Sequence, residues 1–571
     1  MRFQPIIESF KTGEISPLLL GRVSTAQYAS ACKTMENCLP ESHGGVKRRP
    51  GTRFVSEVKD STKNTRLIAF NISRDESYII EVGHLYLRFY IAEARVESGG
   101  SPVEVVTPWT ENDIWDIHFA QANDVMYMVH DGYNPRKLTH TSATSWALTQ
   151  PTFTGAVWNG RSDGDANGFP RTVAFFEQRL WFGGSVSEPT TLWGSKVADF
   201  ENFTVPASAV ADDPVILVMA SYTKDTIQWL AAADNLFIGT TANEHRLTPN
   251  SYVSTTNIPN ISRQASYGSR HIQPEYIGSK VVFVQGSGRQ IRTFSQNTQS
   301  VVELYDSVNL AWLSEHITEG GVVDMAYEQV PDSVLWCVRN DGVLLSATYD
   351  PSVDDDVFGG VGWARHTLTG NVKSIASIPR DDVDQTWIVV ERTINGSTVK
   401  YIEYLDSSIY MDSSLSYSGA ATSVISGLAH LEGETLNVRA DNAVHPQKVV
   451  SSGEITLDYT AGNVVAGLPF VPTLTPVEYE GGVPSGSSQG LPKRWVQAKL
   501  RLHESALPKL NGVRPADRTP SSPMDSTEPL TTGDSTHYNL GNSDNGEITI
   551  TQDLPVPMHI LAIFGHMTVS A

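Results

Sequence analysis

The sequence has 571 residues, of which 40% are hydrophobic and 18% are charged. This balance is typical of a globular protein and excludes a largely disordered chain. At roughly 100–200 residues per domain, the length predicts about three or four domains, or fewer large β domains. The formal net charge of −21 disfavours a nucleic-acid-binding function, because binding to phosphates requires an excess of Lys and Arg.

No apolar run approaches the ~18 residues of a membrane span, so we expect no membrane-spanning segment. The first residues contain no apolar core and no small-residue cleavage site, so we expect no secretory signal. The cysteines are Cys32, Cys38 and Cys337. An odd and sparse set argues against a disulfide framework and predicts folding in a reducing cytoplasm.

Residues 1–60 differ from the rest of the chain in charge and in pattern. They hold nine Lys/Arg and six Asp/Glu, a net charge of +3. The basic run Lys47-Arg48-Arg49 could contact a phosphate, but an assembly contact or an exposed turn explains it better. Apolar residues at helical spacing in 26–39 predict a short helix. We therefore expect 1–60 to be a docking segment that ends at the turn signal Pro50-Gly51.

A repeat of about fifty residues follows. Each unit has an apolar strand, a polar turn and a second apolar strand that contains an aromatic residue, which is a hairpin signal. The aromatic residues that mark the units are Tyr78, Tyr127, Trp181, Phe237, Phe283, Trp336 and Trp387.

This period predicts an all-β fold with a β-propeller of about seven blades over residues 61–406. One hairpin cannot bury its own face, whereas blades stacked around an axis supply one another with partners. The alternative is a row of unrelated β-sandwich hairpins. It is less favoured, because sandwich strands recur every 8–12 residues without a longer period.

After the repeat, alternation of polar and apolar residues predicts a C-terminal platform made of strands. Residues 407–480 are interpreted as a small β-barrel or sandwich, and 481–490 as a flexible Gly/Ser loop. Residues 491–571 are interpreted as a further β platform segment. Within it, 514–541 is rich in turn residues and is expected to be a long loop, either ordered against a partner or mobile.

Three patterns resemble functional motifs but are better explained as loops. Asp163 to Gly168 match the opening of a calcium loop, yet position twelve is Ala174, so a turn is favoured over a weak Ca²⁺ site. Gly486 to Gly490 match G-x-S-x-G but lack the strand and helix of a nucleophile elbow. The acidic runs 354–356 and 381–384 are interpreted as loop charge. We predict no catalytic residue, no metal ligand and no cofactor.

The segment 9–55 carries a set of short motifs that is specific when taken together. They are Gly13-Glu14-Ile15-Ser16-Pro17, Gly21-Arg22-Val23, Tyr28-Ala29-Ser30 and a close that runs from Gly44-Gly45 to Phe54. This opening resembles the nozzle proteins of short-tailed phages, also called the tail tubular protein B family. The departure at Asn37-Cys38, where the family usually has Asn-Phe, puts little in doubt. Further similar stretches extend the resemblance over nearly the whole chain.

The resemblance implies a structural, non-enzymatic virion protein made in the host bacterial cytoplasm. Nozzle proteins form a homo-hexameric tube below a dodecameric tail adaptor, carry tail fibres, retain double-stranded DNA and conduct it during ejection. An acidic wall suits that passage, because it does not bind the phosphates. The residues expected to contribute to assembly are Gly13, Glu14, Ser16, Pro17, Arg22, Arg48, Arg49 and Pro50.

Two other functions remain open. A receptor-binding or glycan-degrading tail spike could use the same propeller, because fold does not fix function. It would require two carboxylates facing each other on the propeller axis, roughly 5–9.5 Å apart. A cellular propeller scaffold is the third possibility, and the phage-like N-terminus disfavours it.

Overall fold

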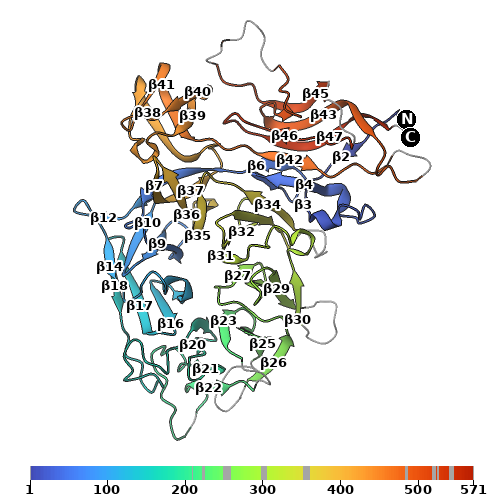
Figure 1. Ribbon diagram of the computed structural model, residues 1–571. Helices are drawn as coiled ribbons and strands as arrows, with labels where there is room; N and C mark the ends of the chain where they lie inside the picture. The colour runs from blue at the N-terminus through green and yellow to red at the C-terminus, as the bar shows by residue number, and fades with distance from the viewer. Residues whose placement is uncertain are drawn as a thin grey trace.

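The computed structural model describes residues 2–208, 210–220, 225–248, 259–296, 305–351, 361–481, 486–516, 523, 526–538, 540 and 545–569. Within these ranges the chain is almost entirely β-structure, and its helical elements are 3-10 helices of three residues each. None of the described helices is long and apolar enough to cross a membrane. The chain forms a propeller with a β platform stacked on one side (Figure 1).

The propeller has seven blades, each an antiparallel sheet whose strands follow one another along the chain. Blade 1 contains β8 (Arg66–Asn71), β9 (Ser77–Gly83), β10 (Tyr86–Ile91), β11 (Ala94–Arg95) and β14 (Glu104–Val106). Blade 2 contains β15 (His118–Ala122), β16 (Val125–His130), β17 (Tyr133–Ser142) and β18 (Ser145–Thr149), and blade 3 contains β19 (Thr172–Phe176), β20 (Arg179–Gly183), β21 (Thr191–Gly194) and β22 (Val215–Val218). Blade 4 contains β23 (Ile227–Ala232), β24 (Leu236–Thr240), β25 (Glu244–Thr248) and β26 (Asn260–Ala265). Blade 5 contains β27 (Glu275–Ile277), β28 (Lys280–Val284), β29 (Ile291–Gln296) and β30 (Tyr305–Asn309). Blade 6 contains β31 (Val322–Glu328), β32 (Val334–Arg339), β33 (Leu344–Thr348) and β34 (Gly362–His366). Blade 7 contains β35 (Asn371–Arg380), β36 (Val383–Ile394) and β37 (Ser397–Asp406).

The aromatic residues that marked the repeat all lie on the second strand of a blade. Tyr78 on β9 and Trp387 on β36 are fully buried, and the other five are at most 3% exposed. Each ring therefore fills the space between its own sheet and a neighbouring blade. The predicted count of seven blades is confirmed.

The last blade is completed by a strand from the N-terminal segment. Strand β7 (Gly51–Glu57) pairs antiparallel with β37, with Tyr401 opposite Glu57 and Asp406 opposite Gly51. This pairing closes the ring, because it joins the first strand of the propeller to the last blade. The boundary placed at residue 60 is therefore wrong, since residues 51–57 belong to blade 7.

The helix expected over 26–39 is not formed. Only Tyr28–Ser30 makes a 3-10 turn, and β4 (Ala31–Glu36) continues as a strand paired with β42 (Thr473–Pro476). The register of that pairing shifts between Cys32 and Thr34. A bulge lets Cys32 and Met35, three residues apart, both point into the core, which imitates helical spacing in the sequence.

Strands from both ends of the chain build the platform. One sheet contains β1 (Arg2–Phe3), β2 (Ile6–Ile7), β5 (Cys38–Pro40), β6 (Val46–Arg48), β43 (Lys493–Ser505), β45 (Thr531–Tyr538) and β47 (His559–Val569). The opposing strands are β3 (Gly13–Glu14), β4, β42, β44 (Lys509–Leu510) and β46 (Ile550–Thr551), and they continue the sheet of blade 6.

A hydrophobic core that includes Met35, Leu474, Trp495 and Ile563 lies between the two sheets of the platform. The N- and C-termini lie side by side, because β1 and β2 pair with β47 (Figure 1). The expected loop over 514–541 contains strand β45, which pairs with β43; its residues 517–522, 524–525, 539 and 541 lie outside the described part of the chain.

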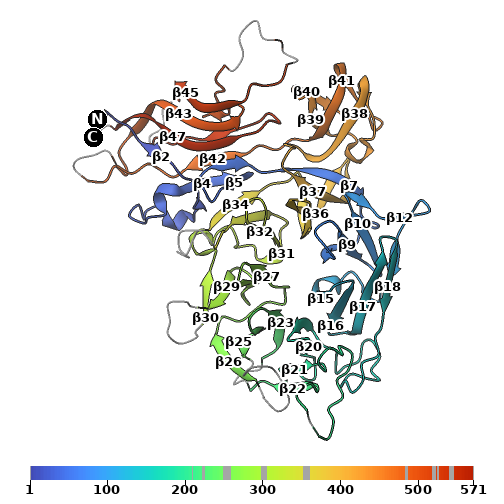
Figure 2. The same ribbon diagram turned by 180° about the vertical axis from the view of Figure 1, so that it is seen from behind.

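The region 407–480 extends the sheet of blade 7. Its strands β38 (Asp412–Ile425), β39 (Thr435–Ala440), β40 (Ala443–Val449) and β41 (Ile455–Leu468) follow β7 in one continuous sheet with its own hydrophobic core. Figure 2 shows this unit above the propeller, beside the two packed sheets of the platform. Two blades thus continue into the platform, which makes the joint between the two parts extensive.

Candidate functional site

The basic run that precedes β7 lies inside the joint between propeller and platform. Arg49 and Asp412 are completely buried and form a two-pronged ion pair, with N–O distances of 2.8 and 2.7 Å. Arg49 also donates from Nε to Asn37 Oδ1 at 2.9 Å, and its guanidinium lies 3.7 Å from the centre of the Phe470 ring. A buried arginine requires this full set of partners.

Arg48 has the same structural role one residue earlier. Its guanidinium donates to the carbonyl oxygens of Leu554, Val556, Tyr410 and Phe470, at distances of 2.5 to 3.1 Å. Burial lowers the pKa of Arg48 to about 9. Arg48 and Arg49 thus hold segments from four parts of the chain together, and the expectation that they contact another subunit is wrong, because neither reaches the surface.

Gly13 and Glu14 are also internal. Gly13 has φ +68°, and a Cβ atom there would lie 2.4 Å from the carbonyl oxygen of Trp363, so only glycine fits. The Glu14 carboxylate is 1% exposed, accepts from the Met35 amide at 2.8 Å and lies 2.9 Å from both His316 Nε2 and Arg365. Burial raises its pKa, but the bonds to His316 and Met35 and the charge of Arg365 outweigh that effect, so the net pKa is lowered.

Part of the predicted assembly set does reach the surface. Ser16 is buried and caps the 3-10 helix η1 (Pro17–Leu19) by accepting from the Leu18 amide. Pro17 and Arg22 are exposed, and Leu18 beside them is 91% exposed. Pro50 is partly buried at the start of β7. Within the predicted assembly set, the exposed residues therefore lie in the segment 17–22.

The axis of the propeller is crossed by a strut between blades 2 and 5. The rings of His118 and His271 stack in parallel with their centres 4.0 Å apart. His271 Nδ1 lies 2.6 Å from the Gln228 carbonyl, and Gln273 donates to the Phe119 carbonyl at 3.3 Å. Blades 2 and 5 consequently meet across the ring at this point.

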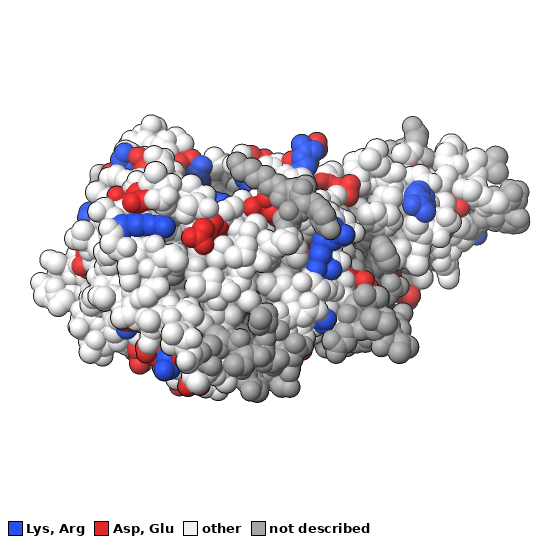
Figure 3. Space-filling model, turned by 90° about the horizontal axis from the view of Figure 1, so that it is seen from below, with Lys and Arg blue, Asp and Glu red and all other residues white. Residues whose placement is uncertain are grey.

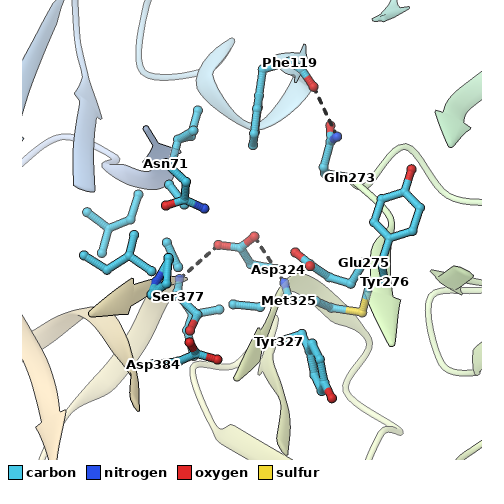
Figure 4. Close-up of a pocket in the computed structure, with 18 of the residues that line it drawn as sticks. Asn71, Phe119, Gln273, Glu275, Tyr276, Asp324, Met325, Tyr327, Ser377 and Asp384 are labelled. Carbon is cyan, nitrogen blue, oxygen red and sulfur yellow. Dashed lines mark hydrogen bonds between the residues drawn. The ribbon is translucent and has the colours of Figure 1, made fainter. Parts of the chain in front are cut away.

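Two chambers remain on the axis. The larger, of about 440 Å³, is lined by the inner strands of blades 1, 2, 5, 6 and 7. Three acidic side chains line it, those of Glu275 on β27, Asp324 on β31 and Asp384 on β36 (Figure 4). We call it the acidic chamber.

In the acidic chamber, the carboxyl groups of Asp324 and Glu275 differ in their hydrogen bonds. Asp324 is 5% exposed and accepts from Ser374 Oγ at 2.7 Å and from the Ile375 amide at 3.0 Å. The side chain of Glu275 has no hydrogen-bond partner within the described residues. Burial, and then the neighbouring charge of Asp324, raise the pKa of Glu275 to about 8. Glu275 is thus a protonated acid at neutral pH, and it faces a cavity.

One unusual residue in the sequence belongs to this chamber. Asp324 interrupts the apolar strand VVDMAYE, where a buried charge is unexpected. Glu275 carried no comparable signal, because it lies beside a turn. One of the two acidic runs contributes Asp384 to this chamber, where its side chain accepts from the Gln329 amide at 2.6 Å. Residues 354–356 of the other run are outside the described part of the chain.

The segment that resembles the opening of a calcium loop has a structural role. Asp163 pairs with Arg136 at 2.6 Å, and Asp165 accepts from the Asn167 amide at 2.8 Å, as in an Asx turn. In the described part of the chain, no group of three or more His, Cys, Asp or Glu is placed to hold a metal ion. The three cysteines are buried and free, and burial raises the pKa of Cys38 to about 12.

The surface charges are mixed where they can be seen. In Figure 3, which views the outer edge of the propeller ring from below, acidic and basic side chains are interspersed over the described surface. This side of the molecule shows, in its described part, no continuous basic stripe of the kind that typically accompanies nucleic-acid binding.

No protein-family model matches the chain, and no curated protein matches it. Among solved structures, the chain is similar to the β-propeller domain of Cps50 (Swd1) from Myceliophteria thermophila, with 10% identity over 62% of this chain and 99% of that one and a TM-score of 0.39. It is also similar to the WD40 domain of Neurospora crassa Pan2, with 9% identity over 60% of this chain and 90% of that one and a TM-score of 0.31.

Proposed function

We propose that this protein is a structural subunit of a short-tailed phage tail nozzle, which assembles as a hexameric tube below a tail adaptor. The observation that carries the proposal is the motif set of residues 9–55. Its buried members, such as Gly13 and Arg49, are the residues that the joint between propeller and platform requires. The motif is thus tied to the joint between the two stacked parts of this chain.

The exposed part of the motif offers a contact surface. Leu18 is 91% exposed, and Pro17 and Arg22 are exposed beside it. A large apolar side chain fully in water, held by a capped turn, suits a protein–protein contact. We assign the segment 17–22 to docking, either onto the adaptor or onto a neighbouring subunit.

The axial strut supports placing the DNA path outside the propeller. The stack of His118 on His271 narrows the ring, and the chambers of about 440 and 380 Å³ are too small to hold a duplex. In the proposed tube the propeller is a wall element, and DNA passes between the subunits around the six-fold axis. The net charge of −21 per subunit keeps that wall from retaining the phosphates.

Electron microscopy of the purified chain, alone and with its adaptor, tests the proposal. We expect six-fold rings with an axial hole, and we expect Leu18→Asp to reduce ring formation or adaptor binding. Val218→Asp is the matched control, because Val218 is 70% exposed on the distant blade 3. The proposal fails if the chain remains monomeric with the adaptor and if virions that lack it still assemble tails.

A glycan-degrading spike remains the second candidate because of the acidic chamber. The carboxyl groups of Glu275 and Asp324 both line it, and glycoside hydrolysis uses two carboxyl groups, one of them as a general acid. Host polysaccharide should then be cleaved by the purified chain, and Glu275→Gln should abolish cleavage. Equal turnover by the variant, or no turnover by either protein, would exclude this candidate.

A further inference from the structure

The second chamber on the propeller axis differs from the first in charge. It has a volume of about 380 Å³ and lies where the inner strands of blades 1, 2, 5, 6 and 7 begin. Its lining includes Thr65, Asp116, His271 and Asn340 in addition to four basic side chains, those of Arg270, Arg339, Lys373 and Lys400. We call it the basic chamber.

The positive charge of the basic chamber is only partly neutralised. Arg339 pairs with Asp341. Lys373 and Lys400 share one carboxylate, that of Glu391, at 3.0 and 3.7 Å. The one acidic side chain among the lining residues is Asp116. Positive charges held this close in a partly enclosed space repel one another, and an anion between them would relieve that repulsion.

Among the four basic side chains of the basic chamber, Arg270 alone has no acidic partner within the described residues. Its guanidinium makes no hydrogen bond there either, although its backbone amide is bonded to the Val284 carbonyl. Arg270 is exposed, so its charge is available to an anion.

The state of Lys400 agrees with this interpretation. Its side chain is 6% exposed. Burial lowers its pKa, and Lys373 lowers it further, against the opposing effect of Glu391. The ammonium group thus lies where additional negative charge would be favourable.

We propose that the basic chamber binds a small phosphate-bearing molecule. Arginine matches phosphate with two parallel hydrogen bonds, and the lysines contribute point charges. The chamber is large enough for a phosphorylated small molecule and too small for a DNA duplex, so its ligand is a free metabolite-sized anion and not the genome. This site does not depend on the proposed assembly, since it lies within one chain.

Calorimetric titration of the full chain with inorganic phosphate, at constant ionic strength against chloride, tests the site. We expect saturable binding of one phosphate per chain. Arg270→Gln should weaken binding about tenfold or more, because it removes a charge-assisted pair of hydrogen bonds. Lys373→Gln should weaken it as well.

Arg289→Gln is the matched control, since Arg289 is a 61% exposed arginine outside the chamber, and it should leave phosphate binding unchanged. Melting curves in phosphate-free buffer verify that each variant folds. The proposal is overturned if phosphate does not bind above the chloride background, or if the control variant loses as much affinity as Arg270→Gln. It is also overturned if a short DNA duplex binds through Arg270 while inorganic phosphate does not, because the ligand would then be the nucleic-acid backbone.

Discussion

Replacing Arg49 with alanine should separate the propeller from its platform. The side chain lies at the joint, where it is fully buried and pairs with the equally buried Asp412. Its loss leaves the carboxylate of Asp412 in the interior without a counter-charge, and the side chain of Asn37 loses the donor that it accepts from.

The expected cost follows from the burial of both partners. Removing one member of a fully buried ion pair costs roughly 3–5 kcal/mol, because the remaining charge is desolvated without compensation. Replacing both members by apolar residues of similar volume is often close to neutral. We therefore expect Arg49→Ala to lose roughly 3–5 kcal/mol of unfolding free energy, and Arg49→Met with Asp412→Leu to recover most of that loss.

Urea unfolding followed by tryptophan fluorescence measures these differences, and limited proteolysis shows whether the two parts come apart. Arg22→Ala is the control, because Arg22 is an exposed arginine of the same motif and should change stability by less than about 0.5 kcal/mol. A loss below about 1 kcal/mol for Arg49→Ala, or a double variant as unstable as the single one, would refute the reasoning.

Three further changes test other parts of the structure. Gly13→Ala should abolish soluble expression, since its Cβ would lie 2.4 Å from the Trp363 carbonyl oxygen; normal yield would contradict this. Glu275 keeps its proton in the folded state up to a pKa of about 8, against an ordinary value of 4.5, so its contribution to stability is present at low pH and is lost as the pH rises through that window. Glu275→Gln should consequently unfold at a higher urea concentration than the wild type at pH 9, with little difference at pH 4. If the variant and the wild type differ by the same amount at both pH values, the raised pKa is contradicted. His271→Ala should remove the strut to His118 and lower the melting temperature, and an unaltered melting temperature would show that the strut contributes nothing.

Much of the fold could be predicted from the sequence, because propeller blades are local. Each hairpin pairs residues that are close in the chain, and its buried aromatic residue, such as Trp181 or Trp336, recurs at the blade period. The predicted helix over 26–39 failed for the opposite reason. Its strand β4 takes its partners from β42, more than 400 residues further on, and a bulge gave it a misleading spacing.

Function-related residues were harder to place from sequence. The motif of residues 9–55 was visible, but which of its members are internal was not, because Arg49 meets Asp412 363 residues away. The chambers were invisible for the same reason, since Thr65, Arg270 and Lys373 come from three separate blades. The sequence by itself determined the repeat, the blade count and the acidic balance, which depend on local pairing and composition. Only the tertiary structure decided which charges are buried, which are exposed and which meet on the axis, because closing the ring brings together residues that the chain keeps hundreds of positions apart.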